Sequence, residues 1–275
     1  MNGVFPMELS SLPIIAGCLL IPPLVGSLVD GLLLRYDAKK QGGKIPPLSQ
    51  PFQEVFMLLR QNNGAVSCEP FICILLALSF ELVALGMLGL QKNLTPILFL
   101  QSAGILAMGM ARMHHSVPGG GRSANCELKA FLTRTPLLIL VAAGIFFATG
   151  SFSLAGLHEY PRLLVIDLPF LWVSLLFIEQ ASRRDVNEPS TGPAPAFVKL
   201  ANSYRSGIIL LLAGFFFAGN LVGAVAAAVF LHMALVWFGH IQHRFSWRQK
   251  SKWGWGYLYF AVLLNLSWIY IKYWL

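Results

Sequence analysis

The sequence predicts an all-α polytopic membrane protein with about eight transmembrane helices and one amphipathic interfacial helix. Of its 275 residues 56% are hydrophobic and 12% charged, whereas soluble domains carry roughly 25% charged residues. Apolar runs close to the ~20 residues that a spanning helix needs occupy most of the chain. We therefore expect a single membrane domain over residues 1–275, and no nucleic-acid partner, disulfide scaffold or disordered chain.

The expected membrane segments follow one another along the whole chain. They cover residues 10–34, 69–90, 95–111, 134–155, 163–179, 206–220, 222–240 and 255–274. Pro22 and Pro23 break the first segment, a break that is tolerated where neighbouring helices satisfy the freed carbonyls. A short turn at 219–223 joins the sixth and seventh segments into a hairpin.

Basic residues alternate between the two sides of the predicted bundle. The long loops at 35–61, 112–134, 180–205 and 241–254 hold 17 of the 20 Lys and Arg residues, and the opposite face holds only Lys92, Arg162 and Lys272. Cytoplasmic loops of membrane proteins carry the excess of Lys and Arg. The four long loops are therefore expected in the cytoplasm and both termini outside.

The first long loop contains a helix that is too polar to cross the membrane. Within residues 48–61, Phe52, Val55, Phe56 and Leu59 recur with helical spacing, opposite polar side chains. An amphipathic helix in the membrane interface fits this pattern. A loop helix packed on a partner protein fits it equally well.

The same loop carries the most specific sequence motif. Its residues Pro46, Gln50, Pro51, Phe52, Glu54, Leu58 and Leu59 match a Gly-Pro, Leu-Gln-Pro, aromatic, acid, Lys-Leu-Leu pattern, with Ile45 and Met57 replacing its glycine and lysine. This loop resembles the first cytoplasmic loop of the subunit 1 family of respiratory complex I. The family also includes the matching membrane subunits of energy-converting nickel–iron (NiFe) hydrogenases and formate hydrogenlyases.

Two further stretches are similar to the same family. The stretch from Ser123 through Glu127 to Pro136 resembles the family's Ser-Arg-Glu-Leu stretch, which leads into a helix through Glu-Pro. The end of the fifth segment, Phe177-Ile178-Glu179, resembles the family's Phe-Ile-Glu. The family continues there with Pro-Phe-Asp and a glutamate-rich run. With a one-residue gap Asp185 and Glu188 match its Asp and first Glu, whereas Arg183 and Arg184 replace the Pro-Phe and Ser190 replaces the second Glu.

The resemblance implies a subunit that carries no cofactor of its own. Family members bind a peripheral electron-transfer arm through their cytoplasmic loops and pass the redox event to antiporter-like membrane subunits of the prokaryotic cytoplasmic membrane. Fe–S clusters and a NiFe centre, or flavin and quinone, are then expected in hydrophilic partner subunits. The residues expected to dock this arm are Arg35, Lys39, Lys40, Lys44, Gln50, Glu54, Glu127, Arg183, Arg184, Asp185 and Glu188.

Several acidic residues lie within the apolar segments, where a charge costs about 2.5–3.5 kcal/mol. Glu81 lies in the middle of the second segment, and Asp30 closes the first. Asp167 and Glu179 lie 12 residues apart in the fifth, or about 18 Å along a helix. These acids are expected at different depths, as a chain of protonatable groups would be. Alternatively each fixes helix packing, which is the favoured role for His232 in the seventh segment.

The favoured function is a non-catalytic anchor and coupling subunit of an energy-converting NiFe hydrogenase. The chain is short for a complex I member, and the family's acidic run is reduced to Asp185 and Glu188. The alternative is a quinone-binding subunit of a complex I-like dehydrogenase. A stand-alone transporter would be expected to show internal repeats or paired broken helices, whereas only the first segment is visibly broken.

Overall fold

The computed structural model describes residues 12–40, 42, 45–60, 68–113, 120–158, 160, 162–182, 193–241 and 254–274. These residues are almost entirely helical, and apart from one isolated bridge between Asn93 and Ser153 they contain no strand. The helices are α1 (Leu12–Lys40), α2 (Gln50–Arg60), α3 (Cys68–Gly89), α4 (Leu94–Met113), α5 (Gly120–Thr149), α6 (Leu164–Asp167), α7 (Pro169–Ser182), α8 (Pro193–Phe215), α9 (Leu221–Ile241) and α11 (Tyr259–Trp274). Short turns η2 (Leu154–His158) and η3 (Gly254–Leu258) complete the set.

Four helices among the described residues are long and apolar enough to cross a membrane. The qualifying stretches are Leu19–Tyr36, Glu69–Gly89, Leu94–Met113 and Phe131–Thr149. The remaining expected segments coincide with α6–α7, α8, α9 and η3–α11, of which the apolar stretches Pro169–Glu179 and Leu221–Trp237 are shorter. The all-helical membrane architecture is therefore confirmed, whereas the number of eight spans stays a prediction.

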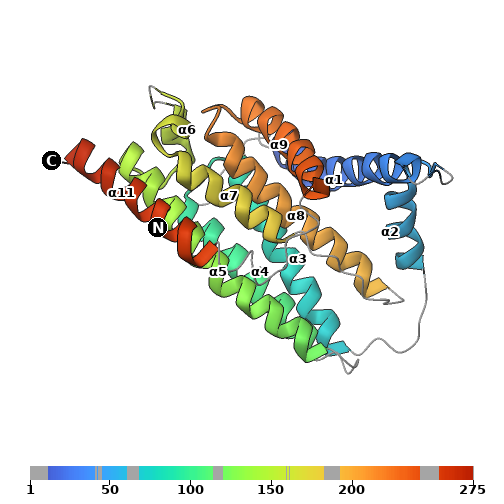
Figure 1. Cartoon of the computed structure of the whole chain (residues 1–275). Coiled ribbons are helices and arrows are strands. Elements are labelled where there is room, and N and C mark those ends of the chain that lie inside the picture. The colour runs from blue at the N-terminus through green and yellow to red at the C-terminus, as the bar shows by residue number, and fades with distance from the viewer. Residues whose placement is uncertain are drawn as a thin grey trace.

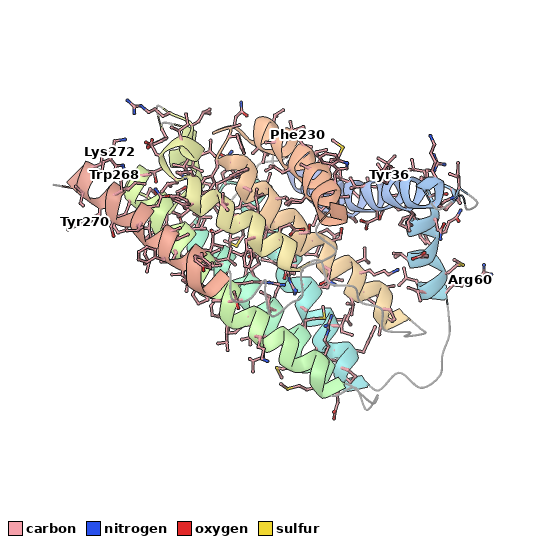
Figure 2. All side chains as sticks on the ribbon, viewed as in Figure 1. Tyr36, Arg60, Phe230, Trp268, Tyr270 and Lys272 are labelled. Carbon is pink, nitrogen blue, oxygen red and sulfur yellow. The ribbon has the colours of Figure 1, made fainter. Side chains whose placement is uncertain are left out.

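The bundle is built around long helices that lie side by side, α3, α4, α5, α7 and α8, with α11 along one flank (Figure 1). Glycines allow two pairs of helices to approach closely. A Cβ atom on Gly144 of α5 would overlap Leu171 of α7, and one on Gly214 of α8 would overlap the backbone of Ala224 on α9. Large aromatic side chains such as Phe230 and Trp268 cover the outside, where 68% and 65% of their surface is exposed (Figure 2). The outer surface is thus suited to lipid or to other membrane subunits.

Helix α1 is continuous through the two prolines at which the sequence predicts a break. Pro22 and Pro23 both lie inside Leu12–Lys40. Helix α8 supports α1 at this point, because Ser203 Oγ donates a hydrogen bond to the Pro22 carbonyl at 3.2 Å. A Cβ atom on Gly207 would lie 2.8 Å from Pro22 Cβ, so the glycine permits the close approach. The predicted break in this segment is therefore wrong.

The helix that is broken is the fifth predicted segment, which the sequence pattern treats as one span. It divides at Leu168, whose φ of −123° and ψ of 50° lie outside the helical region, into α6 and α7. Pro169 accounts for the break, because a residue that precedes proline is disfavoured in helical conformation. The Asp167 carbonyl freed there accepts a hydrogen bond from Asn265 Nδ2 at 3.0 Å, and Val165 N–H donates to the Phe216 carbonyl at 3.0 Å.

Two helices begin well inside stretches expected to be loops. Helix α5 starts at Gly120 and α8 at Pro193, so the backbones of Arg134 and Arg205 are helical. Both side chains are buried, with 4% and 3% of their surface exposed. The predicted charge alternation therefore rests on 15 of these cations instead of 17, because the side chains of Arg134 and Arg205 belong to the protein interior.

Three predicted loops and the C-terminal helix meet at one end of the bundle. Leu94 N–H, after the α3–α4 turn, donates to the Phe152 carbonyl, after α5, at 2.9 Å. At the start of α6, Val165 N–H donates a hydrogen bond to the carbonyl of Phe216, just after α8. Lys272, near the end of α11, forms an ion pair with Asp167 at the end of α6. The alternation of the chain between two ends thus follows the predicted order from α3 onwards.

Candidate functional site: a buried polar layer

A layer of buried polar side chains separates two apolar clusters in the bundle. The larger cluster contains residues such as Ala84, Leu98 and Ile208, and the smaller one consists of Ile74, Ala77, Ala107, Met108, Ala111 and Ala201. Between these clusters along α3, α4 and α8 lie Glu81, Gln101 and Arg205. We use the name polar layer for these three residues together with Arg134, Glu179 and Ser206, which contact or adjoin them.

Glu81 and Arg205 form an ion pair at the centre of the polar layer. Arg205 Nε donates to Glu81 Oε1 at 2.9 Å, and the two side chains are 4% and 0% exposed. A Cβ atom on Gly104 would lie 2.9 Å from this carboxylate oxygen, so only glycine leaves room for it there. Arg134 on α5 also interacts electrostatically with Glu81. Removing one partner of such a buried pair costs about 3–5 kcal/mol, because the other charge is left uncompensated.

Glu179 on α7 joins the same layer through the next residue of α8. Its side chain is fully buried, and Ser206 Oγ donates a hydrogen bond to Glu179 Oε1. Arg205 and Ser206 are consecutive, so they differ by only about 1.5 Å along the helix axis. The α8 partners of Glu81 and Glu179 therefore lie at one level of the helix, whereas the sequence predicts the two acids at different depths. The polar layer thus contains two acidic residues, Glu81 and Glu179, and two basic ones, Arg134 and Arg205.

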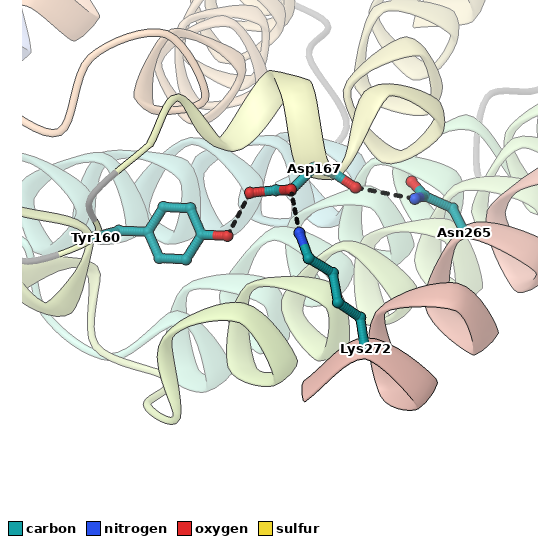
Figure 3. A network of polar contacts seen from close by, with 4 residues as sticks. All are labelled: Tyr160, Asp167, Asn265 and Lys272. Atoms are coloured by element: carbon teal, nitrogen blue, oxygen red, sulfur yellow. Dashed lines mark hydrogen bonds and ion pairs between the residues drawn. The ribbon is translucent and has the colours of Figure 1, made fainter. Parts of the chain in front are cut away.

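Asp167 belongs to a separate network at the end of the bundle where α6 and α7 meet (Figure 3). Tyr160 Oη donates to Asp167 Oδ2 at 2.6 Å, and Lys272 Nζ donates to Oδ1 at 3.1 Å. Asn265 and Lys272 both come from α11, so this network attaches the broken helix to the C-terminal helix. About 15 Å of α7 separates it from Glu179.

The remaining predicted coupling residue, Asp30, is exposed on α1. His232, for which a packing role is favoured, is buried on α9 with 8% of its surface accessible. Within the described residues no three His, Cys, Asp or Glu side chains are grouped as a metal site would require.

Three of the predicted docking residues, Arg35, Gln50 and Glu54, help to fix the position of α2. Arg35 Nε donates to the Pro46 carbonyl at 2.9 Å, which holds the elbow between α1 and α2. Lys199 on α8 pairs with Glu54 Oε2 at 2.9 Å, and Gln50 Nε2 donates to Glu54 Oε1 at 3.5 Å. Figure 1 shows the result, with α2 turned away from the end of α1.

The rest of the predicted docking set is only partly described. Lys39 is exposed on α1, while Lys40 and Glu127 are placed by the backbones of α1 and α5. Lys44, Arg183, Arg184, Asp185 and Glu188 lie outside the described residues.

Helix α2 confirms the predicted amphipathic helix in this stretch of the chain. Phe56 and Met57 remain 71% and 58% exposed, and no residue of the helix is buried. Its apolar face is therefore available, and lipid interface and partner protein both remain open as its occupant.

Sequence reasoning missed Gln101, Arg134 and Arg205. The sequence places the two arginines in loops because each lies near the edge of an apolar run. The sequence does contain an indication of these cations, because an acid such as Glu81 inside a membrane segment needs a positively charged partner. Gln101 offered a similar signal, as the polar member of a helical apolar stripe from Leu94 to Ala111.

The comparisons with known proteins identify a shared fold. No protein-family model matches the sequence, and no curated protein matches it. Among solved structures, the chain is similar to one in the membrane-bound sulfane sulfur reductase (MBS), an archaeal respiratory membrane complex. The two share 16% identity with a TM-score of 0.70, and the match covers 94% of this chain and 99% of that chain. A likeness of this extent, over almost the full length of both chains, places them in the same fold.

Proposed function

We propose that this chain is the membrane-anchor and coupling subunit of a redox-driven, ion-translocating complex. The polar layer is the observation that carries the proposal, because two acids and two arginines are buried between apolar clusters within a membrane bundle. Ionisable residues in such positions mark ion or proton pathways. The shared fold with a subunit of a respiratory membrane complex supports this assignment.

In this proposal Glu179 and Glu81 take part in proton movement or in its coupling to the redox reaction. Glu179 is held by a neutral hydroxyl of Ser206, whereas Glu81 is paired with the guanidinium of Arg205. The two carboxyl groups thus have different partners at one level of α8, so a change in the Arg205 pair affects both. Asp167 acts as a structural residue, since its contacts join α6 to α11.

The complex is proposed to be of the energy-converting NiFe hydrogenase kind, as the sequence motifs favour. Hydrophilic Fe–S subunits would dock on the side that carries α2 and the start of α8, and antiporter-like subunits would lie beside the bundle within the membrane. A second candidate is a sulfane-sulfur-reducing complex, favoured by the name of the structurally similar complex.

The proposed orientation places both termini outside the prokaryotic cytoplasmic membrane, with the four basic loops in the cytoplasm. This follows from the positive-inside rule applied to the 15 loop cations.

Purification of the intact complex through a tag on this chain tests the assignment. We expect co-purified Fe–S subunits together with hydrogen evolution, and sulfane sulfur reduction would select the second candidate. Quinone reduction without either activity would move the chain to the complex I branch. A chain that purifies without partners and transports ions alone would contradict the proposal.

A further inference from the structure

Gln101 is a buried amide with no hydrogen-bond partner among the residues that the structure describes. Its side chain is 1% exposed, and within that part of the chain neither Oε1 nor Nε2 bonds to another protein group. The other buried residues of α4 are apolar or glycine: Leu94, Ile97, Leu98, Gly104, Ile105, Ala107, Met108 and Ala111. Buried polar side-chain groups almost always bond to protein or to ordered water. The amide therefore needs a hydrogen-bond partner that the described part of the chain does not provide.

Gln101 shares its helix face with the residue that borders Glu81. It precedes Gly104 by three positions, which places the two on the same side of α4. The Cβ position of Gly104 lies 2.9 Å from Glu81 Oε1 and 3.5 Å from the Ala77 carbonyl, so this side faces α3. Glu81 Oε2 is also buried without a hydrogen-bond partner. Three unbonded polar atoms thus come from facing sides of α3 and α4, between the two apolar clusters.

We propose that the polar layer binds internal water between α3 and α4, held by the Gln101 amide and by Glu81 Oε2. An amide can both donate to water and accept from it, and a carboxylate accepts. Internal waters in proteins typically make about three hydrogen bonds of this kind. A metal cation does not suit the place, because Arg134 and Arg205 already surround Glu81 with positive charge.

This inference deepens the proposed role of the polar layer. The Arg205 guanidinium, which does not give up its proton, donates to Glu81 Oε1. Water at Oε2 therefore gives this carboxylate a neighbour with which it can exchange protons. Gln101 is then a positioning residue, which holds water for Glu81 without titrating itself. The water is observable whether or not the complex translocates ions, so the two proposals fail separately.

The water is tested directly by infrared spectroscopy of the intact complex in lipid nanodiscs. The quantity measured is the difference between spectra recorded in H₂¹⁶O and in H₂¹⁸O. We expect a band of internal water that shifts on exchange, disappears in Gln101→Leu and changes in Glu81→Gln. The matched control is Ser102→Ala, since Ser102 faces Thr135 on α5 and its loss should leave the band in place. A band unchanged in Gln101→Leu, or a cryo-EM map of the wild type without density at the amide, would overturn the proposal.

Thermal unfolding of the same variants gives a second readout with a definite sign. A dry amide is destabilising, so its replacement by the similarly sized leucine would raise the unfolding temperature by several degrees. A hydrated amide has its partners, so we expect Gln101→Leu to leave the unfolding temperature unchanged or to lower it. A rise relative to the wild type and to Ser102→Ala would contradict bound water.

Discussion

At the scale of single residues, the account depends on how each buried charge is compensated. Glu81 and Arg205 are almost completely buried and joined at 2.9 Å, whereas Glu54 and Lys199 make an equally short pair with 39% and 50% of their side chains exposed. Exposed pairs contribute about 0–1 kcal/mol because solvent screens them. The two pairs therefore offer a matched comparison within one protein.

We predict that Glu81→Gln destabilises the folded chain by about 3–5 kcal/mol, because the buried Arg205 guanidinium loses its carboxylate partner. The double variant Glu81→Gln/Arg205→Gln should recover part of this loss, since it removes the buried charge of Arg205 but leaves that of Arg134. Glu54→Gln should change stability by less than about 1 kcal/mol. Thermal unfolding in detergent measures all three, and a single Glu81→Gln variant as stable as the wild type would refute the buried pair.

At the scale of the elements, the broken helix α6–α7 is held in place by α11. Asn265 bonds the carbonyl that the break exposes, and Lys272 bonds the side chain of the same residue, Asp167. The two contacts differ in burial, because Asn265 is 7% exposed and the Lys272 side chain 37%.

We therefore expect Asn265→Ala to cost about 1–3 kcal/mol, the penalty for an unpaired buried carbonyl. Lys272→Met should cost less, because solvent already screens much of that ion pair. Hydrogen exchange at Val165 and Trp172, whose amides flank the break, should accelerate in Asn265→Ala. Equal effects of the two substitutions would argue against a role of the buried carbonyl.

Glycines at helix crossings provide a test of the packing between elements. A side chain on Gly214 would meet the backbone of Ala224, whereas nothing lies within 4 Å of a Cβ atom on Gly86 in α3. We predict that Gly214→Ala separates α8 from α9 and destabilises the chain. Gly86→Ala should instead stabilise it by roughly 0.5–1 kcal/mol, the usual gain in a helix interior. Unfolding temperatures that shift in the same direction would show that α8 and α9 do not cross as described.

At the scale of the whole molecule, apolar runs were enough to locate the helices but not their ends. Each expected segment coincides with a helix or a helix pair, and the amphipathic α2 was predicted from its periodicity. The early starts of α5 and α8 were not predictable from hydropathy, because the first turns of α5 are polar and those of α8 contain two prolines. The start of α8 is stabilised by tertiary contacts, since Ala194, Phe197 and Val198 pack against the smaller apolar cluster. Pro169 is a local indication of the break at Leu168. The two consecutive prolines Pro22 and Pro23 indicate a break more strongly, but α1 is continuous through them.

The candidate site could be predicted only in part, because it also depends on contacts between residues far apart in the sequence. Acids in apolar segments are conspicuous, so Glu81 and Glu179 were found in the sequence. Their partners could not be paired with them, because Arg205 is 124 positions from Glu81 and Ser206 is 27 from Glu179. Only the packing of α8 against α3 and α7 shows that these contacts form one layer.

The proposed orientation of the molecule predicts opposite labelling at its two ends. A membrane-impermeant thiol reagent added to intact cells should label Lys92→Cys, in the α3–α4 turn, and should leave Lys199→Cys on α8 unlabelled. The four native cysteines, Cys18, Cys68, Cys73 and Cys126, are first replaced by serine. The reverse pattern would invert the orientation.

The central claim is that the polar layer couples redox chemistry to ion movement, and Glu179→Gln tests it most directly. Glutamine preserves the size of the side chain and a carbonyl acceptor for Ser206, but it does not titrate. The measurement is the number of ions translocated per electron by the purified complex in sealed vesicles, with Asp167→Asn as the control. We predict intact subunit composition, and a number of ions per electron that falls far below the wild-type value in Glu179→Gln while the control stays near it. Transport at the wild-type ratio in Glu179→Gln would contradict the account and return the polar layer to a packing role.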